Sequence, residues 1–183
     1  PYTIQNYLSD QITVPRFSTD LPEFKATEKA VQDRIKHLLG IKGKKSVDSI
    51  HKELGHVMWE YVGMARTKEG LQTALGKLKE IRKEFETNLF IPELEGVNIE
   101  LDKALRLNDF ITMGQLIAID ALNREESCGG HFREEHQTEE GEAKRDEQNC
   151  LDVSCWENQG EDQDHLKYQE HHKYETKETK TRN

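Results

Sequence analysis

Apolar residues recur at helical spacing through the middle of the chain and become rare toward its end. Between Val31 and Leu122 they lie three or four positions apart, which is typical of amphipathic helices. From residue 128 to residue 183, the only Leu, Ile, Val or Phe residues are Phe132, Leu151, Val153 and Leu166. The first two thirds of the chain are therefore expected to hold the hydrophobic core.

The first predicted helix begins at Glu23 and ends at Gly40, a residue type that favours a helix C-terminal cap. Its apolar face would contain Phe24, Val31, Ile35, Leu38 and Leu39. Ser46 can cap a second helix, which we expect to end near Ala65. The buried face of this second helix would contain Val47, Ile50, Leu54, Val57, Met58 and Tyr61.

Thr67 and Asn98 can cap a third and a fourth helix. The third would bury Leu71, Ala74, Leu75, Leu78, Ile81 and Phe85. The fourth would bury Leu101, Ala104, Leu107, Phe110, Ile111, Gly114, Ile117, Ala121 and Leu122. Because such helices bury their apolar faces against one another, the sequence predicts a mainly α fold. We expect an up-and-down bundle of three to four helices over residues 23–125.

The segments on either side of the bundle have a different pattern. Residues 1–22 contain Pro15 and Pro22 among other turn formers, which predicts an extended connector. Residues 126–183 predict a polar, largely irregular C-terminal tail. It would contain at most one short strand, at Leu151, Val153 and Cys155. We expect residues 162–183 to be mobile unless a partner holds them.

Composition and charge exclude several classes of partner. Only 34% of the residues are hydrophobic and 33% are charged, and the formal net charge is −9. This charge argues against unaided binding to nucleic acid or to an anionic bilayer. No stretch approaches the roughly 18 apolar residues of a membrane-spanning helix, so we expect no direct membrane insertion. Three cysteines do not form a disulfide framework and favour a reducing compartment.

The N-terminal residues, Pro1 to Ile4, lack both an initiator Met and the features of a signal peptide. We therefore expect the chain to be a piece of a longer polypeptide.

Two patterns within the predicted helices resemble binding sites only in part. The turn 40–46 is rich in glycine and lysine, but it lacks the glycine spacing of a P-loop and follows a helix rather than a strand. Glu53 and His56 have the Glu-x-x-His spacing of di-iron bundles, yet no second copy occurs. A basic turn and a pair of surface polar contacts are the favoured interpretations.

The tail contains a third pattern, two pairs of soft ligands about twenty residues apart, as in small zinc sites: Cys128 with His131, and Cys150 with Cys155. The second pair has a wide gap, and Cys155 alternates with apolar residues as a strand residue would. Three further histidines, His165, His171 and His172, lie in a charged stretch where solvation is the usual state. We predict no catalytic, cofactor-binding or metal residues, and keep a tail zinc site as an alternative.

Charged side chains crowd the segment 124–135, which we call the plug: Arg124, Glu125, Glu126, His131, Arg133, Glu134 and Glu135. One interpretation is the solvated end of a helix. The other is a polar element that docks on another domain, because Gly129 and Gly130 let the backbone turn tightly and approach another surface. The residues alone leave both interpretations open.

Two signatures resemble the flavoprotein subunit of succinate dehydrogenase and fumarate reductase. Residues 51–66 read HKELGHVMWEYVGMAR, and residues 124–133 read REESCGGHFR. In that family the corresponding segments read approximately H-x-E-L-x-x-x-M-W-x-x-V-G-x-x-R and R-x-E-S-R-G-x-H-x-R. The family's following R-D-D is nearly matched by Arg145, Asp146 and Glu147. Cys128 stands where the family usually has Arg.

The resemblance covers about residues 1–160 and implies a C-terminal helical domain behind a split flavin-binding domain with an inserted capping domain. The parent would interconvert succinate and fumarate through FAD and pass electrons to an iron–sulfur subunit and quinone. The family's flavin-linking and substrate-binding residues lie upstream, so this chain alone is expected to bind no cofactor and to be inactive. The parent complex would be cytoplasmic, peripheral on the cytoplasmic face of the inner membrane.

Polar residues of both signatures are the candidates for interdomain docking on the flavin-binding and capping domains: His51, Glu53, Arg66, Arg124, Glu126, His131, Arg133, Arg145 and Asp146. Within the parent, the iron–sulfur subunit would be a further, indirect partner. The alternative from a different class is a free-standing helical adaptor protein with zinc in its tail.

Overall fold

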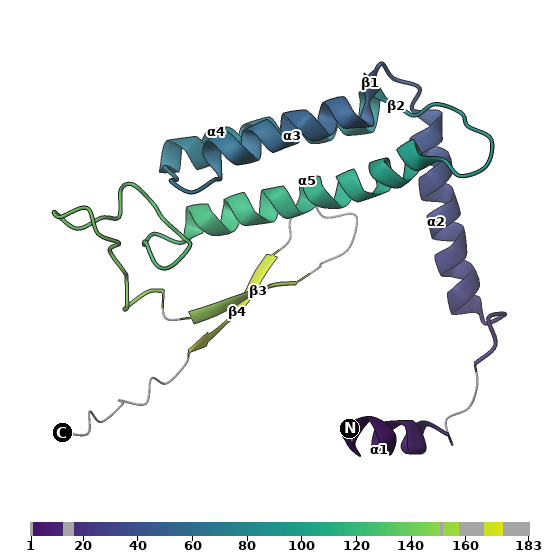
Figure 1. The fold of residues 1–183 in the computed structure, drawn as a ribbon, viewed down its shortest axis with the longest axis horizontal. Coiled ribbons are helices and arrows are strands. Elements are labelled where there is room, and N and C mark those ends of the chain that lie inside the picture. Colours follow the sequence, from purple (N-terminus) through teal and green to yellow (C-terminus); the bar gives the residue numbers. More distant parts are fainter. Residues whose placement is uncertain (1, 13–16, 151, 158–166, 174–183) are drawn as a thin grey trace.

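The structure is a computed structural model that describes residues 2–12, 17–150, 152–157 and 167–173 (Figure 1). Over these ranges it contains five helices: α1 (Tyr2–Gln11), α2 (Pro22–Gly40), α3 (Val47–Tyr61), α4 (Lys68–Asn88) and α5 (Ile99–Asn123). The strands are short: β1 (Lys45–Ser46), β2 (Leu89–Phe90), β3 (Asp152–Glu157) and β4 (Lys167–Lys173). The predicted mainly helical class is confirmed. No described helix is long and apolar enough to cross a bilayer.

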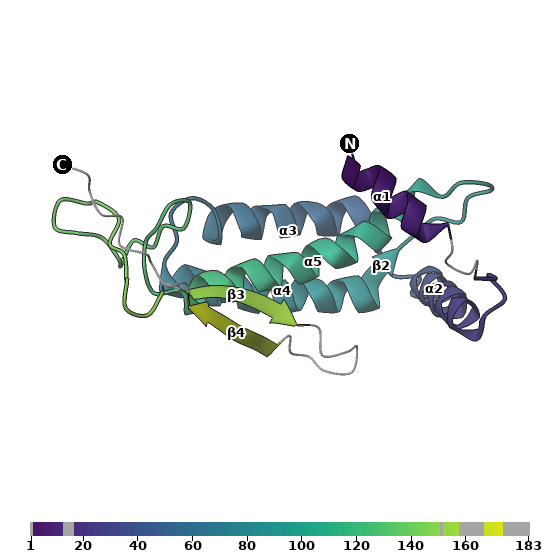
Figure 2. The same ribbon diagram turned by 90° about the horizontal axis from the view of Figure 1, so that it is seen from below.

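Helices α3, α4 and α5 lie side by side and hold the core (Figures 1 and 2). Their predicted N-caps are confirmed. The side-chain oxygens of Ser46, Thr67 and Asn98 accept hydrogen bonds from the backbone N–H three residues further on, at 3.2, 3.0 and 3.1 Å. Each cap satisfies a donor that the first helical turn leaves without a partner.

Helix α3 ends at Tyr61 rather than near Ala65. The reason is Arg66, whose Nε donates hydrogen bonds to the carbonyl oxygens of Val62 and Gly63 at 3.1 and 3.0 Å. These carbonyls would otherwise accept bonds from the next helical turn, so the side chain replaces the continuation of the helix.

The buried side chains follow the predicted periodicity, with two exceptions on α5. Phe110 and Ile117 were predicted to be buried, but they are 48% and 44% exposed. The prediction was wrong for these two because nine residues span too wide an arc of one helix to be covered by two neighbours. The centre of the buried face of α5 consists of Ala104, Leu107, Ile111, Gly114, Ala118 and Ala121.

A half-buried arginine fixes α4 against α5. Arg82 donates to Asn108 Oδ1 at 3.0 Å and to Thr112 Oγ1 at 2.6 Å, both on α5. A guanidinium has fixed donor directions, so two such bonds set the rotation and register of one helix relative to the other.

Helix α2 leaves one end of the bundle at a steep angle (Figures 1 and 2). Its C-terminal end contacts the bundle through the buried Leu38. The predicted apolar face is wrong toward the N-terminus, where Phe24 and Val31 are about half exposed. The periodicity was real, but the bundle covers only one end of this helix.

The first segment is a further correction. Residues 2–11 form helix α1 instead of an extended connector, and all of them are exposed. Pro15 and Pro22 led to the wrong prediction because they restrict only their neighbours, whereas Tyr2–Gln11 contains no proline.

The turn between α2 and α3 joins the end of α4 through a short parallel sheet that was not predicted. Strands β1 and β2 pair Lys45 with Leu89. A Cβ atom on Gly43 would lie 2.0 Å from the backbone carbonyl carbon of Asn88, so only glycine permits this approach. Gly40 does not form the expected left-handed cap; it is the last helical residue, and Lys42 has the positive φ, at 47°.

The tail contains two strands where at most one was predicted. Strands β3 and β4 pair antiparallel, with Val153 opposite His172 and Trp156 opposite Tyr168. The expected strand at residues 151–155 is confirmed from Asp152 onward. The prediction missed β4 because its residues, KYQEHHK, are polar on both faces, so no hydrophobic alternation marks it.

Candidate functional site

The plug folds back onto the bundle and pairs with the loop between α3 and α4. The backbone N–H of Arg66 donates to Phe132 O at 3.1 Å, and the N–H of Glu134 donates to Arg66 O at 2.9 Å. A tight turn precedes this pairing, in which Cys128 and His131 exchange backbone hydrogen bonds of 2.8 and 3.1 Å. Gly129 within the turn has φ of +58°, which favours glycine. The two signature segments therefore meet in space.

Arg133 is the most deeply buried charged residue of the plug, with 1% of its surface exposed. Its guanidinium donates to the carbonyl oxygens of Ala121 and Leu122 at 2.9 and 3.2 Å. These carbonyls belong to the last turn of α5, where a cation is favoured by the negative end of the helix dipole. Arg133 therefore caps the C-terminus of α5.

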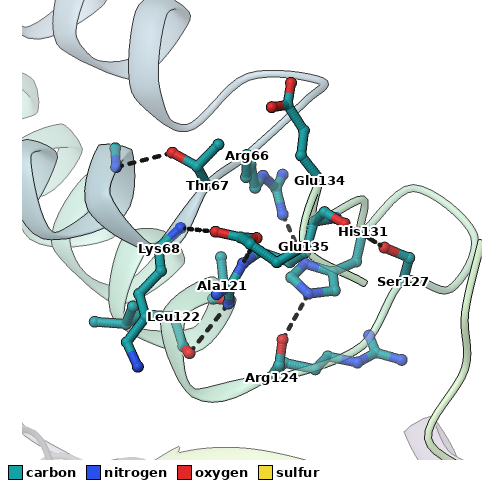
Figure 3. A network of polar contacts seen from close by, with 12 residues as sticks. Arg66, Thr67, Lys68, Ala121, Leu122, Arg124, Ser127, His131, Glu134 and Glu135 are labelled. Carbon is teal, nitrogen blue, oxygen red and sulfur yellow. Dashed lines mark hydrogen bonds and ion pairs between the residues drawn. The ribbon is translucent and has the colours of Figure 1, made fainter. Parts of the chain in front are cut away.

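Glu135 contacts the N-terminal end of helix α4. Its carboxylate accepts a hydrogen bond from the backbone N–H of Lys68, the first residue of α4, and pairs with Arg133 Nε at 3.2 Å (Figure 3). Partial burial alone would raise the pKa of Glu135, but the backbone N–H groups of Lys68 and of Glu135 itself, together with the charge of Arg133, outweigh burial and lower the pKa. Glu135 was not among the predicted docking residues, because only the fold brings it to the start of α4.

Ser127 connects the two arms of the plug. Its hydroxyl accepts a hydrogen bond from the backbone N–H of Arg133 at 2.8 Å and donates to the carbonyl oxygen of the same residue at 3.0 Å. Ser127 is fully buried. It lies in the second signature but was absent from the predicted site, because a serine in a polar segment gives no signal of burial.

His131 lies between Arg66 and Arg124 (Figure 3). Its Nδ1 is 3.0 Å from Arg66 Nη1, and its Nε2 is 2.9 Å from the backbone oxygen of Arg124. A guanidinium only donates and a carbonyl only accepts, so the ring must be neutral with its proton on Nε2. Burial lowers the pKa of His131, and the nearby positive charges of Arg66, Arg124 and Arg133 lower it further.

Glu126 ties the plug to the segment that follows it. Arg124 Nε donates to its carboxylate at 2.7 Å, and the backbone N–H of Asp146 donates to the same carboxylate at 2.9 Å. Asp146 in turn accepts from the N–H groups of Gln148 and Asn149 at 3.1 and 3.0 Å. Arg145 is more than half exposed and lies 3.8 Å from Glu147. Of the predicted pair, Arg145 therefore extends toward solvent, whereas Asp146 accepts hydrogen bonds within a turn of the chain.

The two predicted residues at the start of the first signature lie far from the plug, in α3. His51 stacks on Phe110 of α5 with ring centroids 5.6 Å apart. Glu53 pairs with Lys45 at 3.0 Å, and Lys45 also contacts Glu84 at 3.4 Å. Glu53 therefore makes a polar contact at the helix surface, as the favoured interpretation has it, and His56 is exposed.

No group of three or more His, Cys, Asp or Glu side chains that could hold a metal occurs among the described residues. Of the predicted zinc ligands, His131 has both ring nitrogens engaged by Arg66 and Arg124. The side chain of Cys155 lies outside the described residues, as do the side chains of His165, His171 and His172. The observed contacts of His131 favour a packing role over a ligand role.

Comparison with known proteins identifies the architecture. A family model described as the fumarate reductase flavoprotein C-terminal region matches residues 51–183, which include both signatures. The chain belongs to this family.

Similar proteins fall into several flavoenzyme types. An uncharacterized FAD-dependent oxidoreductase of Methanocaldococcus jannaschii is 32% identical over 59% of this chain and 19% of that protein. The fumarate reductase flavoprotein subunit of Proteus vulgaris is 32% identical over 69% and 20% of the two chains. A chloroplastic L-aspartate oxidase of Nicotiana tabacum is 35% identical over 45% and 13%. The chain thus spans at most about a fifth of the length of these relatives.

The fold agrees with this membership. An E. coli quinol fumarate reductase structure superposes with a TM-score of 0.65 over 87% of this chain and 26% of that one, at 24% identity. At this sequence identity, the structural similarity supports a shared fold and nothing more specific. The predicted resemblance to the flavoprotein subunit is confirmed by the family match.

Proposed function

We propose that this chain is the C-terminal helical domain of an FAD-dependent flavoprotein that interconverts succinate and fumarate. The domain would support the flavin-binding and capping domains without contributing a catalytic centre. The match of residues 51–183 to the fumarate reductase flavoprotein C-terminal family carries this proposal. The parent would pass electrons to an iron–sulfur subunit and act at the cytoplasmic face of the membrane.

The contacts of the nine predicted docking residues divide them into two groups. Five hold the plug in shape through short internal hydrogen bonds: Arg66, Arg124, Glu126, His131 and Arg133. Glu53 and Asp146 also have partners within the chain. We propose that the first five set the shape of the plug, while Arg145 and His51, whose side chains are exposed, are available to contact the rest of the parent.

A second candidate for the parent reaction is the oxidation of L-aspartate, because the similarity to the tobacco L-aspartate oxidase reaches 35%. Succinate and aspartate are both four-carbon dicarboxylates. The substrate is selected upstream of this chain, so the helical domain would serve either parent in the same way. Assaying the full-length gene product with succinate, fumarate and L-aspartate separates these candidates.

The absence of a catalytic centre can be tested on the chain itself. Purified 183-residue protein is mixed with FAD and dialysed, and flavin absorbance and dye-coupled turnover of succinate are then measured, with the full-length flavoprotein as positive control. We expect no retained flavin and no turnover for the chain alone. Retained flavin or measurable turnover would overturn the supporting role.

A further inference from the structure

Hydrogen bonds fasten the start of the plug to a later segment of the chain. The backbone N–H of Ser127 donates to Lys144 O at 2.8 Å, and the backbone N–H of Asp146 donates to the carboxylate of Glu126 at 2.9 Å. Glu126 is only 3% exposed, and a hydrogen bond to a carboxylate is strong where water is excluded. Cys128 directly follows Ser127, so this connection sets its place relative to the later segment.

Cys150 lies on the other side of the same connection. Its backbone N–H donates to Asp146 O at 2.9 Å, so it lies one turn beyond the residue that Glu126 holds. Cys128 is fixed in a similar way, because it exchanges two backbone hydrogen bonds with His131. The two cysteines therefore belong to short, hydrogen-bonded turns that begin at one shared connection.

The guanidinium of Arg124 lies near both sulfur atoms. Burial alone would lower the pKa of Arg124, but the Glu126 carboxylate and the charges of Cys128 and Cys150 outweigh burial and raise the pKa. Charges interact mainly within about 10 Å at ordinary ionic strength, so each sulfur lies within about that distance of the same cation. Both cysteine side chains are half-buried. Cysteines that react with small molecules typically occupy such partly exposed places beside a cation.

The donors available here favour a covalent bond between the two thiols over a bound metal. Structural zinc takes four protein ligands. Among the described residues, no group of three His, Cys, Asp or Glu side chains is placed to hold a metal. His131, in the same turn as Cys128, has both ring nitrogens engaged in hydrogen bonds. The chemistry left to two neighbouring thiols is thiol–disulfide exchange.

We propose that Cys128 and Cys150 form a reversible disulfide by exchange with a small-molecule disulfide such as oxidised glutathione. The thiolate of one cysteine attacks a sulfur of the small disulfide, which forms a mixed disulfide and releases one small thiolate. The thiolate of the other cysteine then attacks the protein sulfur of the mixed disulfide, which forms the internal bond and releases the second small thiolate. The protein loses two electrons and two protons in total, and the small disulfide gains them as two thiols. This inference does not depend on the proposed function.

The internal bond would add a covalent link to the connection that Glu126 makes by hydrogen bonding. It would close the loop 128–150, which contains most of the plug and the hairpin after it. A cross-link of this kind restricts the unfolded chain more than the folded one. The oxidised form should therefore be the more stable of the two.

Mass spectrometry of the Cys155→Ser chain identifies the bond. In this variant Cys128 and Cys150 are the only cysteines, and trypsin places them on separate peptides, residues 125–133 and 146–167. The chain is equilibrated in glutathione buffers from fully reduced to fully oxidised, quenched with acid and alkylated before digestion. We expect the two peptides to be joined after oxidising buffers and separate after reducing ones. The intact oxidised chain should be lighter by two hydrogen atoms.

Other products of the same experiment would overturn the proposal. A glutathione adduct on each cysteine, without an internal bond, would show that the two thiols do not reach each other. A disulfide between two chains would contradict it equally. In the natural chain, a bond from Cys150 to Cys155 in place of the bond to Cys128 would also contradict it.

The melting temperature provides a second readout of the same bond. The oxidised natural chain should melt several degrees above the reduced chain, and Cys155→Ser should keep this difference. Cys128→Ser and Cys150→Ser should each melt at one temperature in both buffers, because neither can close the loop. A difference that persists in Cys128→Ser or Cys150→Ser would contradict the proposal.

A matched pair of variants tests whether the connection at Glu126 brings the thiols together. Glu126→Ala removes the acceptor of the Asp146 N–H, whereas Glu125→Ala removes a neighbouring exposed carboxylate. The ratio of internal to glutathione-mixed disulfide should fall several-fold in the first variant, because the effective concentration of one thiol near the other falls. The ratio should be unchanged in the second, with circular dichroism confirming that both variants are folded. Equal ratios in the two variants would contradict the proposed placement of the thiols.

Discussion

Arg133 and Glu135 lie two residues apart and complement opposite ends of two helices. Arg133 places its charge at the C-terminus of α5, and Glu135 places its carboxylate at the N-terminus of α4. Each end has the opposite partial charge, so both contacts are favourable. At the scale of single residues, the second signature therefore stabilises this domain through contacts within the chain itself.

Replacing Arg133 should therefore weaken the isolated chain. Arg133→Ala leaves two α5 carbonyls and Glu135 without their cation, and removing one member of a buried charged network costs about 3 kcal/mol. We expect the free energy of unfolding, measured with urea, to fall by about that amount. The matched control Arg106→Ala removes an exposed ion pair with Asp102 and should cost below about 0.5 kcal/mol. Equal losses in the two variants would contradict the buried capping role.

His131 predicts a dependence of stability on pH. The folded state keeps the ring neutral and lowers its pKa, whereas the unfolded chain protonates near its ordinary pKa of about 6.5. Below that pH the unfolded state binds more protons, so the free energy of unfolding falls as the pH falls, by at most about 1.4 kcal/mol per pH unit from this residue. Above that pH this contribution is fully present.

The measurement is urea unfolding at pH 7.5 and 5.5 for the natural chain and for His131→Gln. Glutamine cannot titrate, so between pH 7.5 and 5.5 the variant should lose less free energy of unfolding than the natural chain. At pH 7.5 the variant itself should be less stable than the natural chain. Identical pH slopes for the two proteins would show that His131 does not contribute to this dependence.

At the scale of elements, the β1–β2 junction depends on one close backbone approach. Gly43→Ala would force a Cβ into the backbone of Asn88 and disrupt the hydrogen bond from Gly43 N–H to Leu89 O, now 2.8 Å. We expect a loss of roughly 2 kcal/mol in the free energy of unfolding, within the range for strained core substitutions. Gly76→Ala is the matched control, because Gly76 is exposed within α4 and nothing lies within 4 Å of an added Cβ.

The control should change stability in the opposite direction. Alanine in an exposed helix interior is favoured over glycine by about 1 kcal/mol, so Gly76→Ala should raise the urea midpoint. If Gly43→Ala is as stable as the natural chain, the parallel pairing of β1 with β2 is not a structural requirement.

The elements differ in how far the sequence could predict them. Local signals located α3, α4 and α5, because a capping side chain at Ser46, Thr67 or Asn98 precedes a regular apolar stripe. Local signals were insufficient for β4, which is polar on both faces, and for β1–β2, whose partners are more than forty residues apart. The exposure of Phe24 and Val31 depends on where α2 crosses the bundle, and periodicity contains no such information.

At the scale of the whole molecule, the sequence located the plug and the structure explains its contacts. The charged residue types at 124–135 left a solvated helix end and a docking element both open, because their partners include backbone groups of a helix end, such as the carbonyls of Ala121 and Leu122. Backbone partners leave no trace in the sequence. Phe110 and Ile117 of α5 were predicted as core because periodicity does not tell how wide an arc of a helix its neighbours cover.

We propose that this chain supports a flavin-binding parent protein from its C-terminal end. The most direct measurement compares the full-length gene product with a version that ends before Pro1, for bound FAD per polypeptide and melting temperature. We predict that the shortened protein loses flavin and melts at a lower temperature, and that adding the 183-residue chain in trans restores part of both. A shortened protein with the flavin content and melting temperature of the full-length one would contradict the claim.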